Sequence, residues 1–574
     1  MMAELRTPWG ERLDPEQVLQ EYPRPQMVRE SYVNLNGYWD YAITESDAEP
    51  EQWDGRILVP FSPEAPLSGV NRALLPGQTL WYRRGIAETR REGMRLLLHF
   101  GAADQEAKVY VNGTLAGEHL GGYTAFTVEL TALLRDEPSV LTVAVRDGTD
   151  SNEQTRGKQR TRRGGIWYTP QSGIWQTVWM EWVPQAYIAG LRITPDAAGG
   201  CVRVNVLAEE NRVCYLHFAG RRIGAFTNRE TVIRVEQPEL WTPEHPKLYP
   251  FSAEYGQDRV ESYFALRDVG TGTDEKGRPC LTLNGKPYFQ SGVLDQGYWP
   301  DGLYTAPSDE ALIWDIRTMK ELGFNLLRKH IKVEPMRWYY HCDRLGMLVW
   351  QDMPNGGGNY HALTISAPLI TRRHKKDNDY KRFARTDAAA RAQFSAELEE
   401  MVRQLYNCPS VVMWVPFNEG WGQFDAAKAV QRIRALDATR TIDHASGWHD
   451  QGIGDVESLH VYFYAYRFQP DRRGRAVVLS EFGGYNLPVE GHVWNHANFG
   501  YRGYKTPEAL EAAYRKLFAR QILPAREKGL AASVYTQLSD VEDEVNGLVT
   551  YDRRCVKMKA ETVREINQGL IGEK

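Results

Sequence analysis

The sequence lacks the cysteine spacing that marks disulfide-bonded and zinc-binding proteins. Its six cysteines are scattered, and none forms a CxxC or another metal-ligand pattern: Cys201, Cys214, Cys280, Cys342, Cys408 and Cys555. Isolated thiols are typical of proteins in a reducing compartment. The first residues also have no apolar core of a secretory signal peptide. We therefore expect a cytoplasmic protein.

Long apolar runs, low-complexity segments and a large charge excess are missing as well. No run of about 18 apolar residues occurs, so we expect no membrane span. The 69 basic and 74 acidic residues give a net charge of −5. This small value gives no reason to expect nucleic acid or an anionic membrane as a partner. No repeat of solenoid period is present, and we leave a homo-oligomer open because the sequence does not fix the oligomeric state.

The first half of the chain is rich in short strand candidates. A chain of 574 residues exceeds what one hydrophobic core usually supports, so we expect several domains. Residues 1–183 contain strand candidates at 96–100, 107–111 and 141–145, and Asn112-Gly113 is a hairpin signal. This pattern is typical of an antiparallel β-sandwich. Residues 184–268 form a second all-β block, whose length fits an immunoglobulin-like sandwich.

A basic segment interrupts the first β-rich block. Residues 151–165 are polar and contain Arg156, Lys158, Arg160, Arg162 and Arg163. Such a run of positive charges is more often a solvated loop than a ligand-binding segment. We therefore expect a solvated loop here, and we leave open that this loop or the insertion at 355–386 shapes the pocket or a subunit contact.

From residue 269 to 574 the pattern changes to alternating strands and helices. Eight strand candidates occur, as expected of a (β/α)8 barrel, at 288–292, 324–330, 347–352, 411–420, 441–445, 459–463, 476–481 and 532–537. Helices are expected between them, at about 308–322, 336–345, 387–405, 423–436 and 506–528. A polar insertion at about 355–386 precedes the third of these helices.

Two of the predicted barrel strands end on a glutamate. One apolar run closes on Asn418 and Glu419, and another ends at Glu481. The carboxyl ends of parallel barrel strands converge on one cavity, where the chemistry of such folds takes place. Asp352, Asp540 and Glu542 also lie near strand ends, so spacing alone does not select a pair. Each could be a salt-bridged or capping carboxylate, but Asn418 beside Glu419 favours a site that holds a hydroxyl next to the reacting bond.

Together these residues resemble glycoside hydrolase family two, over nearly the whole chain. Motifs similar to its sugar-binding jelly-roll domain are Val59-Pro60-Phe61, Trp81-Tyr82-Arg83-Arg84, Val111-Asn112-Gly113 and Gly173-Ile174-Trp175. Motifs similar to its barrel are Leu283-Asn284-Gly285-Lys286, Asn325-Leu326-Leu327-Arg328-Lys329-His330, Asn418-Glu419 and Ser480-Glu481-Phe482-Gly483. Each motif is weak alone, and their order makes the resemblance specific.

The resemblance implies a retaining glycosidase with Glu419 as general acid/base and Glu481 as nucleophile. Retaining hydrolysis needs one protonated carboxyl to release the leaving oxygen and one ionised carboxylate to attack the anomeric carbon. The resemblance also implies that Asn418 binds the sugar 2-hydroxyl, that Tyr462 supports the nucleophile, and that Arg328 steadies Glu481.

Further candidate substrate-binding residues come from the other strand ends. Trp448 could stack on a sugar or wall the cavity, as could Tyr298-Trp299. His330 is more often a structural barrel histidine than a proton donor. The complete set of these further candidates is Asp295, His330, Asp352, Trp448 and Gln537.

Departures from the family pattern bear on the substrate. The chain has no Arg-His-Glu motif after the first strand, and no Asn-x-Lys of the kind glucuronidases use near the C-terminus, only Val545-Asn546-Gly547-Leu548. We therefore expect an exo-enzyme for terminal neutral sugars, β-galactosidase-like, acting on oligosaccharides or small glycosides. Arabinosidase, galactofuranosidase, mannosidase and glucuronidase activities are alternatives, as is a non-catalytic carbohydrate-binding protein. The large C-terminal domains of long β-galactosidases do not follow the barrel, so we expect no required metal and no cofactor.

Overall fold

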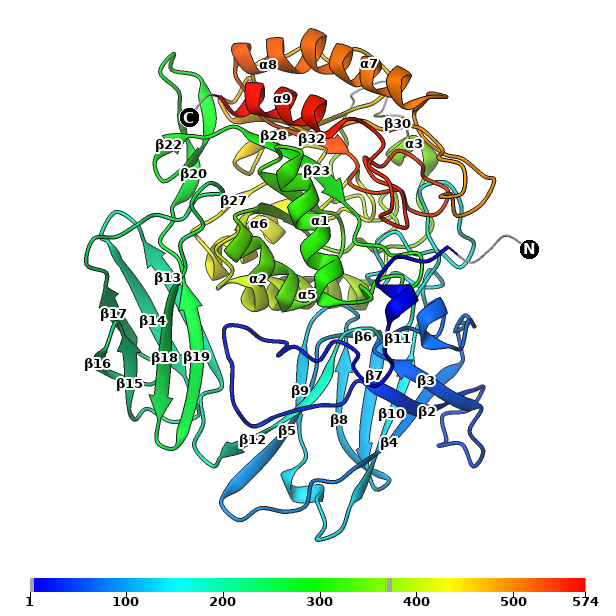
Figure 1. The fold of residues 1–574 in the computed structure, drawn as a ribbon, viewed down its shortest axis with the longest axis vertical. Helices are drawn as coiled ribbons and strands as arrows, with labels where there is room; N and C mark the ends of the chain where they lie inside the picture. Colours follow the sequence, from blue (N-terminus) through cyan, green and yellow to red (C-terminus); the bar gives the residue numbers. More distant parts are fainter. Residues whose placement is uncertain (1–4, 367, 369–373, 573–574) are drawn as a thin grey trace.

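A computed structural model describes residues 5–366, 368 and 374–572. Two β-sandwiches, coloured blue to green, lie against a helix-covered barrel, coloured green to red (Figure 1). The expected combination of a jelly roll, an immunoglobulin-like sandwich and a (β/α)8 barrel is confirmed. None of the described helices is long and apolar enough to cross a membrane.

The jelly roll consists of two antiparallel sheets packed face to face. Asn112 and Gly113 have φ values of 49° and 79°. These left-handed residues form the two-residue turn between β7 and β8, which confirms the predicted hairpin. One sheet has the order β1 (Tyr32–Asn34), β12 (Val178–Pro184), β5 (Met94–Phe100) and β9 (Phe126–Glu129). The other has the order β3 (Gly55–Val59), β2 (Gly37–Thr44), β4 (Thr79–Ile86), β10 (Ser139–Arg146), β7 (Glu106–Val111) and β8 (Thr114–Leu120), and β6 (Ala103–Asp104) pairs with β11 (Gly173–Ile174).

The immunoglobulin-like sandwich is smaller and also antiparallel. Its core contains Val204, Leu216 and Phe264 from facing strands. One sheet contains β13 (Gly190–Asp196), β14 (Cys201–Leu207) and β17 (Glu230–Arg234), and the other contains β16 (Arg221–Phe226), β15 (Val213–Phe218), β18 (Tyr249–Tyr255) and β19 (Asp258–Phe264). The domain boundaries at 183/184 and 268/269 remain our proposal.

Eight parallel strands form the barrel. Their order is β27 (Thr441–Ile442), β26 (Val411–Val415), β25 (Leu348–Asp352), β24 (Leu326–Lys329), β23 (Gln290–Asp295), β32 (Leu530–Thr536), β29 (Ala476–Gly483) and β28 (Val456–Val461). Successive side chains point to opposite faces of a strand. Leu294 and Leu326 thus pack with Trp350 inside the barrel, whereas Val293 and Leu327 pack against the surrounding helices.

A small sheet lies at the entrance to the barrel domain. It consists of β20 (Val269–Thr273), β21 (Pro279–Leu283) and β22 (Lys286–Pro287). Leu281 from β21 and Trp241 from the preceding segment pack with the lower interior residues of the barrel. The amino ends of the strands are therefore closed by apolar side chains, which leaves the carboxyl ends for polar groups.

Three barrel helices begin at the first residues of the predicted helix ranges, where a side chain caps the helix. Ser308, Asp387 and Thr506 each accept a hydrogen bond from a backbone N–H in the first turn of the following helix. The helices are α1 (Asp309–Glu321), α2 (Met336–Leu345), α3 (Ala362–Ile365), α5 (Ala388–Leu405), α6 (Ala426–Leu436), α7 (Pro507–Leu517), α8 (Leu523–Lys528) and α9 (Ala560–Ile571).

Several predicted element boundaries differ from those of the structure, and three of the differences have a clear description. The strand predicted at 459–463 is β28, Val456–Val461, so Tyr462 lies just beyond it. The helix predicted from about 423 starts at Ala426, because Asp425 has a left-handed φ of 41°. The helix predicted over 506–528 contains a π-helical turn at Phe518–Ile522, next to Pro524, whose missing N–H interrupts the regular ladder.

The basic segment 151–165 is not the solvated loop that we expected. Thr155, Arg156 and Lys158 are buried. The backbone N–H of Arg156 donates to the Asn355 carbonyl at 2.7 Å, and the Thr155 hydroxyl donates to Glu397 of α5 at 2.6 Å. The charge run is accommodated because the barrel supplies acceptors, including the Gly357 carbonyl bound by the Arg156 guanidinium.

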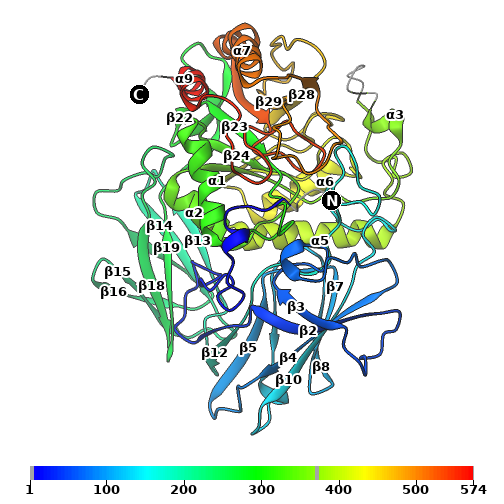
Figure 2. The same cartoon turned by 45° about the vertical axis from the view of Figure 1, so that its right-hand side comes forward.

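Helix α5 joins the jelly roll to the barrel. Figure 2 shows it lying across the boundary between the two parts. Its side chains bond to jelly-roll residues along its length, through Gln393 to the Leu120 carbonyl at 2.9 Å and through Glu400 to the Thr124 hydroxyl at 2.9 Å. This seam holds the segment 155–169 over the carboxyl ends of the barrel strands.

Arg29 connects the two sandwiches through buried charges. Its guanidinium contacts Glu181 of β12 at 3.1 Å and Asp258 of β19 at 2.8 Å, and it donates to the Ile188 carbonyl at 2.6 Å. Arg24 contacts Glu181 at 2.5 Å as well. Two carboxylates of different domains thus share one buried cation.

We expect Arg29→Ala to lower the free energy of unfolding by about 3–5 kcal/mol, because it leaves buried carboxylates without their cation. Urea unfolding followed by circular dichroism measures this change. Arg221→Ala, which removes an exposed partner of Glu236, is the control and should cost less than about 1 kcal/mol. Equal effects of the two substitutions would contradict the role given to Arg29.

Candidate active site

Glu419 lies in the turn that follows β26. Its backbone has a φ of 50°, a left-handed conformation that is uncommon for a residue with a side chain. The Glu419 N–H donates to the Ser446 carbonyl at 2.9 Å, which ties this turn to the loop after β27. The strained turn places the Glu419 carboxyl against His460, whose Nδ1 lies 2.8 Å from Oε1.

Glu481 projects from β29 and is 4% exposed. The Arg328 guanidinium donates to its Oε1 at 3.0 Å, and the Tyr462 hydroxyl donates to its Oε2. Donors to an ionised carboxylate favour the charged form. The surroundings of Glu481 therefore suit a carboxylate that acts as a nucleophile.

The structure brings the two predicted glutamates together. One oxygen of Glu419, one oxygen of Glu481 and one ring nitrogen of His460 all lie within 4.8 Å of one another. Retaining glycosidases hold their two carboxyl groups roughly 5–5.5 Å apart, whereas inverting enzymes need roughly 6.5–9.5 Å to admit a water. An oxygen-to-oxygen distance within 4.8 Å is compatible with the shorter of these two separations.

His460 is a site residue that the sequence analysis missed. Its Nδ1 contacts Glu419 at 2.8 Å and lies 3.6 Å from Glu481. Burial lowers the pKa of His460 to about 4, so the ring is neutral. Because Arg328 can only donate, at 3.4 Å, to Nε2, we assign the ring proton to Nδ1, facing Glu419. His460 lay within the predicted strand 459–463, but no motif singled it out; it shares the inner face of β28 with Ser458.

Arg328 connects most of the charged groups at the barrel axis. Besides Glu481, its guanidinium donates to Asp352 at 2.9 Å and to the Asn418 side-chain oxygen at 2.7 Å. Its side chain is completely buried, and the nearby carboxylates raise the pKa of Arg328 above its ordinary value despite this burial. The predicted contact between Arg328 and Glu481 is present, and Asn418 is fixed by the same guanidinium.

His330 and Asp352 form a supporting pair below the glutamates. His330 Nδ1 lies 2.7 Å from Asp352. Burial lowers the pKa of His330 well below its ordinary value and raises the pKa of Asp352 to about 7. The His330 ring also lies beside Trp421, with 6.3 Å between ring centroids. Asp352 therefore orients Arg328 and His330.

The environment of Glu419 favours a protonated acid. Burial raises its pKa to about 7, and the positive charges of Lys158 and Arg328 act in the opposite direction. The two glutamates thus differ in their partners, because Glu481 has an arginine and a phenol as direct donors. Such a difference is what an acid and a nucleophile in one site require.

Asp295 does not join the glutamates, and its assignment to the site is corrected. Its carboxylate contacts Lys329 Nζ at 2.7 Å, and Lys329 also contacts Glu334 at 2.8 Å. Side-chain alternation along β23 and β24 explains this, because Leu294 and Arg328 face the barrel interior and Asp295 and Lys329 face outwards. Asp295 belongs to a buried ion-pair cluster behind the barrel wall.

Gln537 is held by protein groups, whereas Trp448 lies beside the glutamate pair. The Gln537 amide donates to Asn546 at 2.8 Å and accepts from Gln296 at 2.8 Å, so protein groups already occupy both ends. Trp448 packs edge-on against His460, with 5.4 Å between ring centroids. Trp448 therefore walls the site beside the acid.

The jelly roll contributes part of the cavity wall. Trp167 packs against Trp421 at a centroid distance of 5.2 Å, and the Lys158 ammonium lies 5.8 Å from the Trp421 ring. On the opposite side, Tyr501 stacks on Tyr462 at 3.8 Å. Neither Lys158 nor Trp167 was among the predicted site residues, because a charge run gave no sign of the barrel surface it meets.

Glu419, His460 and Glu481 also have the composition of a metal-binding triad. A cation between them would lie close to the Arg328 guanidinium, which is 3.0 Å from Glu481. Like charges at such distances repel. The arrangement therefore fits proton transfer and nucleophilic attack better than metal binding.

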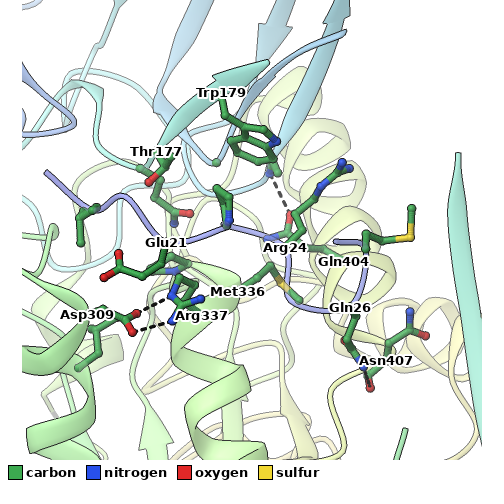
Figure 3. Close-up of a pocket in the computed structure, with 18 of the residues that line it drawn as sticks. Glu21, Arg24, Gln26, Thr177, Trp179, Asp309, Met336, Arg337, Gln404 and Asn407 are labelled. Atoms are coloured by element: carbon green, nitrogen blue, oxygen red, sulfur yellow. Dashed lines mark hydrogen bonds and ion pairs between the residues drawn. The ribbon is translucent and has the colours of Figure 1, made fainter. Parts of the chain in front are cut away.

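A separate cavity lies where the N-terminal segment, the jelly roll and the barrel meet (Figure 3). Trp179 and Arg24 line one side, and Met336 lines another. The Arg337 guanidinium donates to Asp309 at 2.6 Å at its edge. None of the described lining residues is a candidate site residue, so this cavity is distinct from the glutamate pair.

Comparison with known protein families identifies the family of this chain. Residues 278–480 match the TIM barrel domain of glycosyl hydrolases family 2, and residues 203–267 match a second domain described as glycosyl hydrolases family 2. The chain belongs to glycosyl hydrolases family 2. This family-2 chain is 26% identical over 412 residues to a β-galactosidase of Thermoanaerobacter pseudethanolicus, an alignment that covers 67% of the chain and 51% of that relative.

Other family-2 relatives have different names. A β-glucuronidase of Streptococcus agalactiae is 23% identical over 428 residues, covering 69% of this chain and 68% of that protein. The structure of a β-D-glucuronidase from Dictyoglomus thermophilum superposes with a TM-score of 0.73 at 18% identity, covering 95% of this chain and 98% of the other. At this identity the similarity shows the fold alone. The chain spans about half the length of the β-galactosidase that it matches.

His460→Ala removes the N–H that faces Glu419. Because that donor stabilises the ionised form, we expect the pKa of Glu419 to rise and the basic limb of kcat/KM on a nitrophenyl glycoside to move to higher pH. The rate should fall on the order of 10–100-fold. His341→Ala, in α2, is a control for loss of a buried histidine and should leave the limb in place. If the basic limb of the kcat/KM profile stayed in place in the His460 variant, the proposed hydrogen bond from His460 to Glu419 would be contradicted.

Proposed function

We propose that this chain is a retaining exo-glycosidase that acts by double displacement. The observation that carries the proposal is the position of Glu419 and Glu481, with one oxygen of each within 4.8 Å of the other and of His460. The asymmetry of the two carboxyl groups supports it further. One is buried with a pKa raised to about 7, and the other receives hydrogen bonds from Arg328 and Tyr462.

In the first step Glu481 attacks the anomeric carbon and forms an ester. The bond between that carbon and the glycosidic oxygen breaks as Glu419 transfers its proton to the leaving oxygen. Esterification removes the negative charge of Glu481. Glu419, now ionised, then accepts a proton from an incoming water, whose oxygen attacks the anomeric carbon and releases Glu481.

Neighbouring residues keep these groups in place during both steps. Arg328 holds Glu481 and the Asn418 amide, so that the Asn418 amide nitrogen remains available for a sugar hydroxyl. That nitrogen is buried and has no hydrogen-bond partner among the described residues. A non-catalytic carbohydrate-binding protein would not need a strained Glu419 directed at Glu481.

The sugar is a finer part of the proposal. The sequence alone favoured terminal neutral sugars of oligosaccharides or small glycosides, as in a β-galactosidase, with a glucuronidase among the alternatives. Relatives named β-galactosidase and β-glucuronidase are similarly distant, with 26% and 23% identity. A glycoside of an acidic sugar is the second candidate, and the burial of Lys158 beside Glu419 favours it.

The pH profile tests the acid. Glu419 must be protonated to act, and its pKa is raised to about 7. We therefore expect kcat/KM to be maintained below pH 7 and to fall tenfold per pH unit above it. The limb should be absent in Glu419→Ala assayed with a dinitrophenyl glycoside, whose leaving group needs no proton. A limb that persists in this variant would assign the acid to another residue.

Two substitutions test the roles of the glutamates. We expect Glu481→Gln to abolish turnover on every nitrophenyl glycoside. We expect azide to restore the rate of Glu419→Ala and to give the glycosyl azide with retained β-configuration, as NMR of the product would show. An inverted azide from that variant would show that the two roles are exchanged, and a fully active Glu481→Gln variant would exclude the mechanism.

A further inference from the structure

Lys158 is a buried cation that the proposed mechanism does not use. It belongs to the jelly-roll segment that packs on the barrel, and it is 5% exposed. Hydrogen bonds fix the backbone on both sides. The Gly157 N–H donates to the Asn355 carbonyl at 3.0 Å, and the Lys158 carbonyl accepts from the Tyr168 N–H at 3.0 Å. The backbone from which the Lys158 side chain extends is therefore held by the fold.

The ammonium lies among aromatic side chains close enough to Glu419 for its charge to act on that carboxyl. It lies 5.5 Å from the ring centroid of Tyr168 and 5.8 Å from that of Trp421. Trp421 comes two residues after Glu419 and packs beside His330. The charge of Lys158 acts on both groups, because it lowers the pKa of Glu419 and that of His330.

No protein group neutralises this ammonium among the described residues, since neither a hydrogen bond nor an ion pair reaches it. The other fully buried lysines behave differently. Lys329 contacts Asp295 at 2.7 Å, Lys332 contacts Glu334 at 2.8 Å, and Lys557 contacts Asp540 at 2.6 Å. A buried charge without a partner is unfavourable. Lys158 is thus the exception to a rule that this chain otherwise follows.

Nearby acids already have other roles. Glu481 is paired with Arg328 at 3.0 Å, and Glu544 accepts the Tyr168 hydroxyl. Glu419 is protonated below a pKa of about 7. Aromatic faces shield the ammonium and attract it weakly, but they carry no net charge. A ligand with a formal negative charge would complete the site, and it would meet Lys158 next to the scissile bond.

We propose that Lys158 binds a carboxylate of the sugar, so that the enzyme selects glycosides of acidic sugars over their neutral counterparts. This inference rests on the proposed glycosidase function and names the substrate class of that site. A neutral sugar was expected partly because the C-terminal part of the barrel has no Asn-x-Lys lysine to bind a carboxylate. In the structure, a lysine of the jelly roll lies near the glutamate pair instead.

Matched substrates test the inference directly. The 4-nitrophenyl β-glycosides of glucuronate and galacturonate differ from those of glucose and galactose at C6 alone. We expect the wild-type kcat/KM to be at least tenfold higher on an acidic sugar than on its neutral counterpart. Lys158→Met should lower the value for the acidic sugar on the order of 100-fold, mainly through KM, and that for the neutral sugar less than about threefold.

Two further variants control this experiment. Lys158→Arg keeps the charge and should recover most of the selectivity. Arg162→Met removes an exposed positive charge from the same segment and should change kcat/KM on neither the acidic nor the neutral glycosides. Thermal unfolding of each variant checks that the segment stays folded. Equal losses on acidic and neutral sugars in Lys158→Met, or a wild type that prefers the neutral sugars, would overturn the inference.

Binding separates this inference from the proposed mechanism. Calorimetric titration of Glu481→Gln with the two acidic glycosides needs no turnover, and adding Lys158→Met should weaken binding at least 20-fold. Unchanged binding would overturn the role of Lys158 even if catalysis follows the proposed steps. If the wild type cleaves none of the four glycosides but binds the acidic ones through Lys158, the mechanism fails and the recognition stands.

Discussion

One guanidinium at the barrel axis holds the candidate site in a single arrangement. Arg328 contacts Asp352, Glu481 and Asn418 at distances between 2.7 and 3.0 Å, from a completely buried position. Removing a cation from water is costly, and only a full set of acceptors offsets that cost. The barrel provides this set because strands far apart in sequence end side by side. The position of the nucleophile and that of the amide next to the acid are consequently coupled through one side chain.

Much of the fold follows from local sequence patterns. Buried parallel strands are short apolar runs, and the runs that end at Glu419 and Glu481 showed where the two carboxylates would emerge. Capping residues such as Ser308 and Asp387 marked helix starts. Local sequence patterns did not predict features that depend on which way a side chain points or on contacts with another domain. His460 was missed because a histidine inside a predicted strand carries no sign of the carboxylates that face it, and Asp295 was misassigned because its side chain points outwards.

The jelly roll takes part in the site and is more than an appended binding module. Its segment 155–169 carries Lys158, Trp167 and Tyr168 over the ends of the barrel strands, and α5 fixes it there through Glu397. A run of positive charges is usually solvated, but residues 155–159 of this one are buried because the barrel offers carbonyl and carboxylate acceptors, whereas Arg162 and Arg163 stay exposed. Specificity in such an architecture depends on the docking of two domains, so changes at their seam reach the substrate without altering the reacting carboxylates.

The left-handed backbone of Glu419 affects both the stability of the fold and the proposed reaction. A φ of 50° suits glycine or asparagine better than glutamate, and it costs a residue with a longer side chain roughly 1 kcal/mol. Replacing Glu419 by glycine would therefore relieve conformational strain and remove the proposed proton donor at the same time. The folding preference of the backbone and the proposed reaction thus make opposite demands on this position.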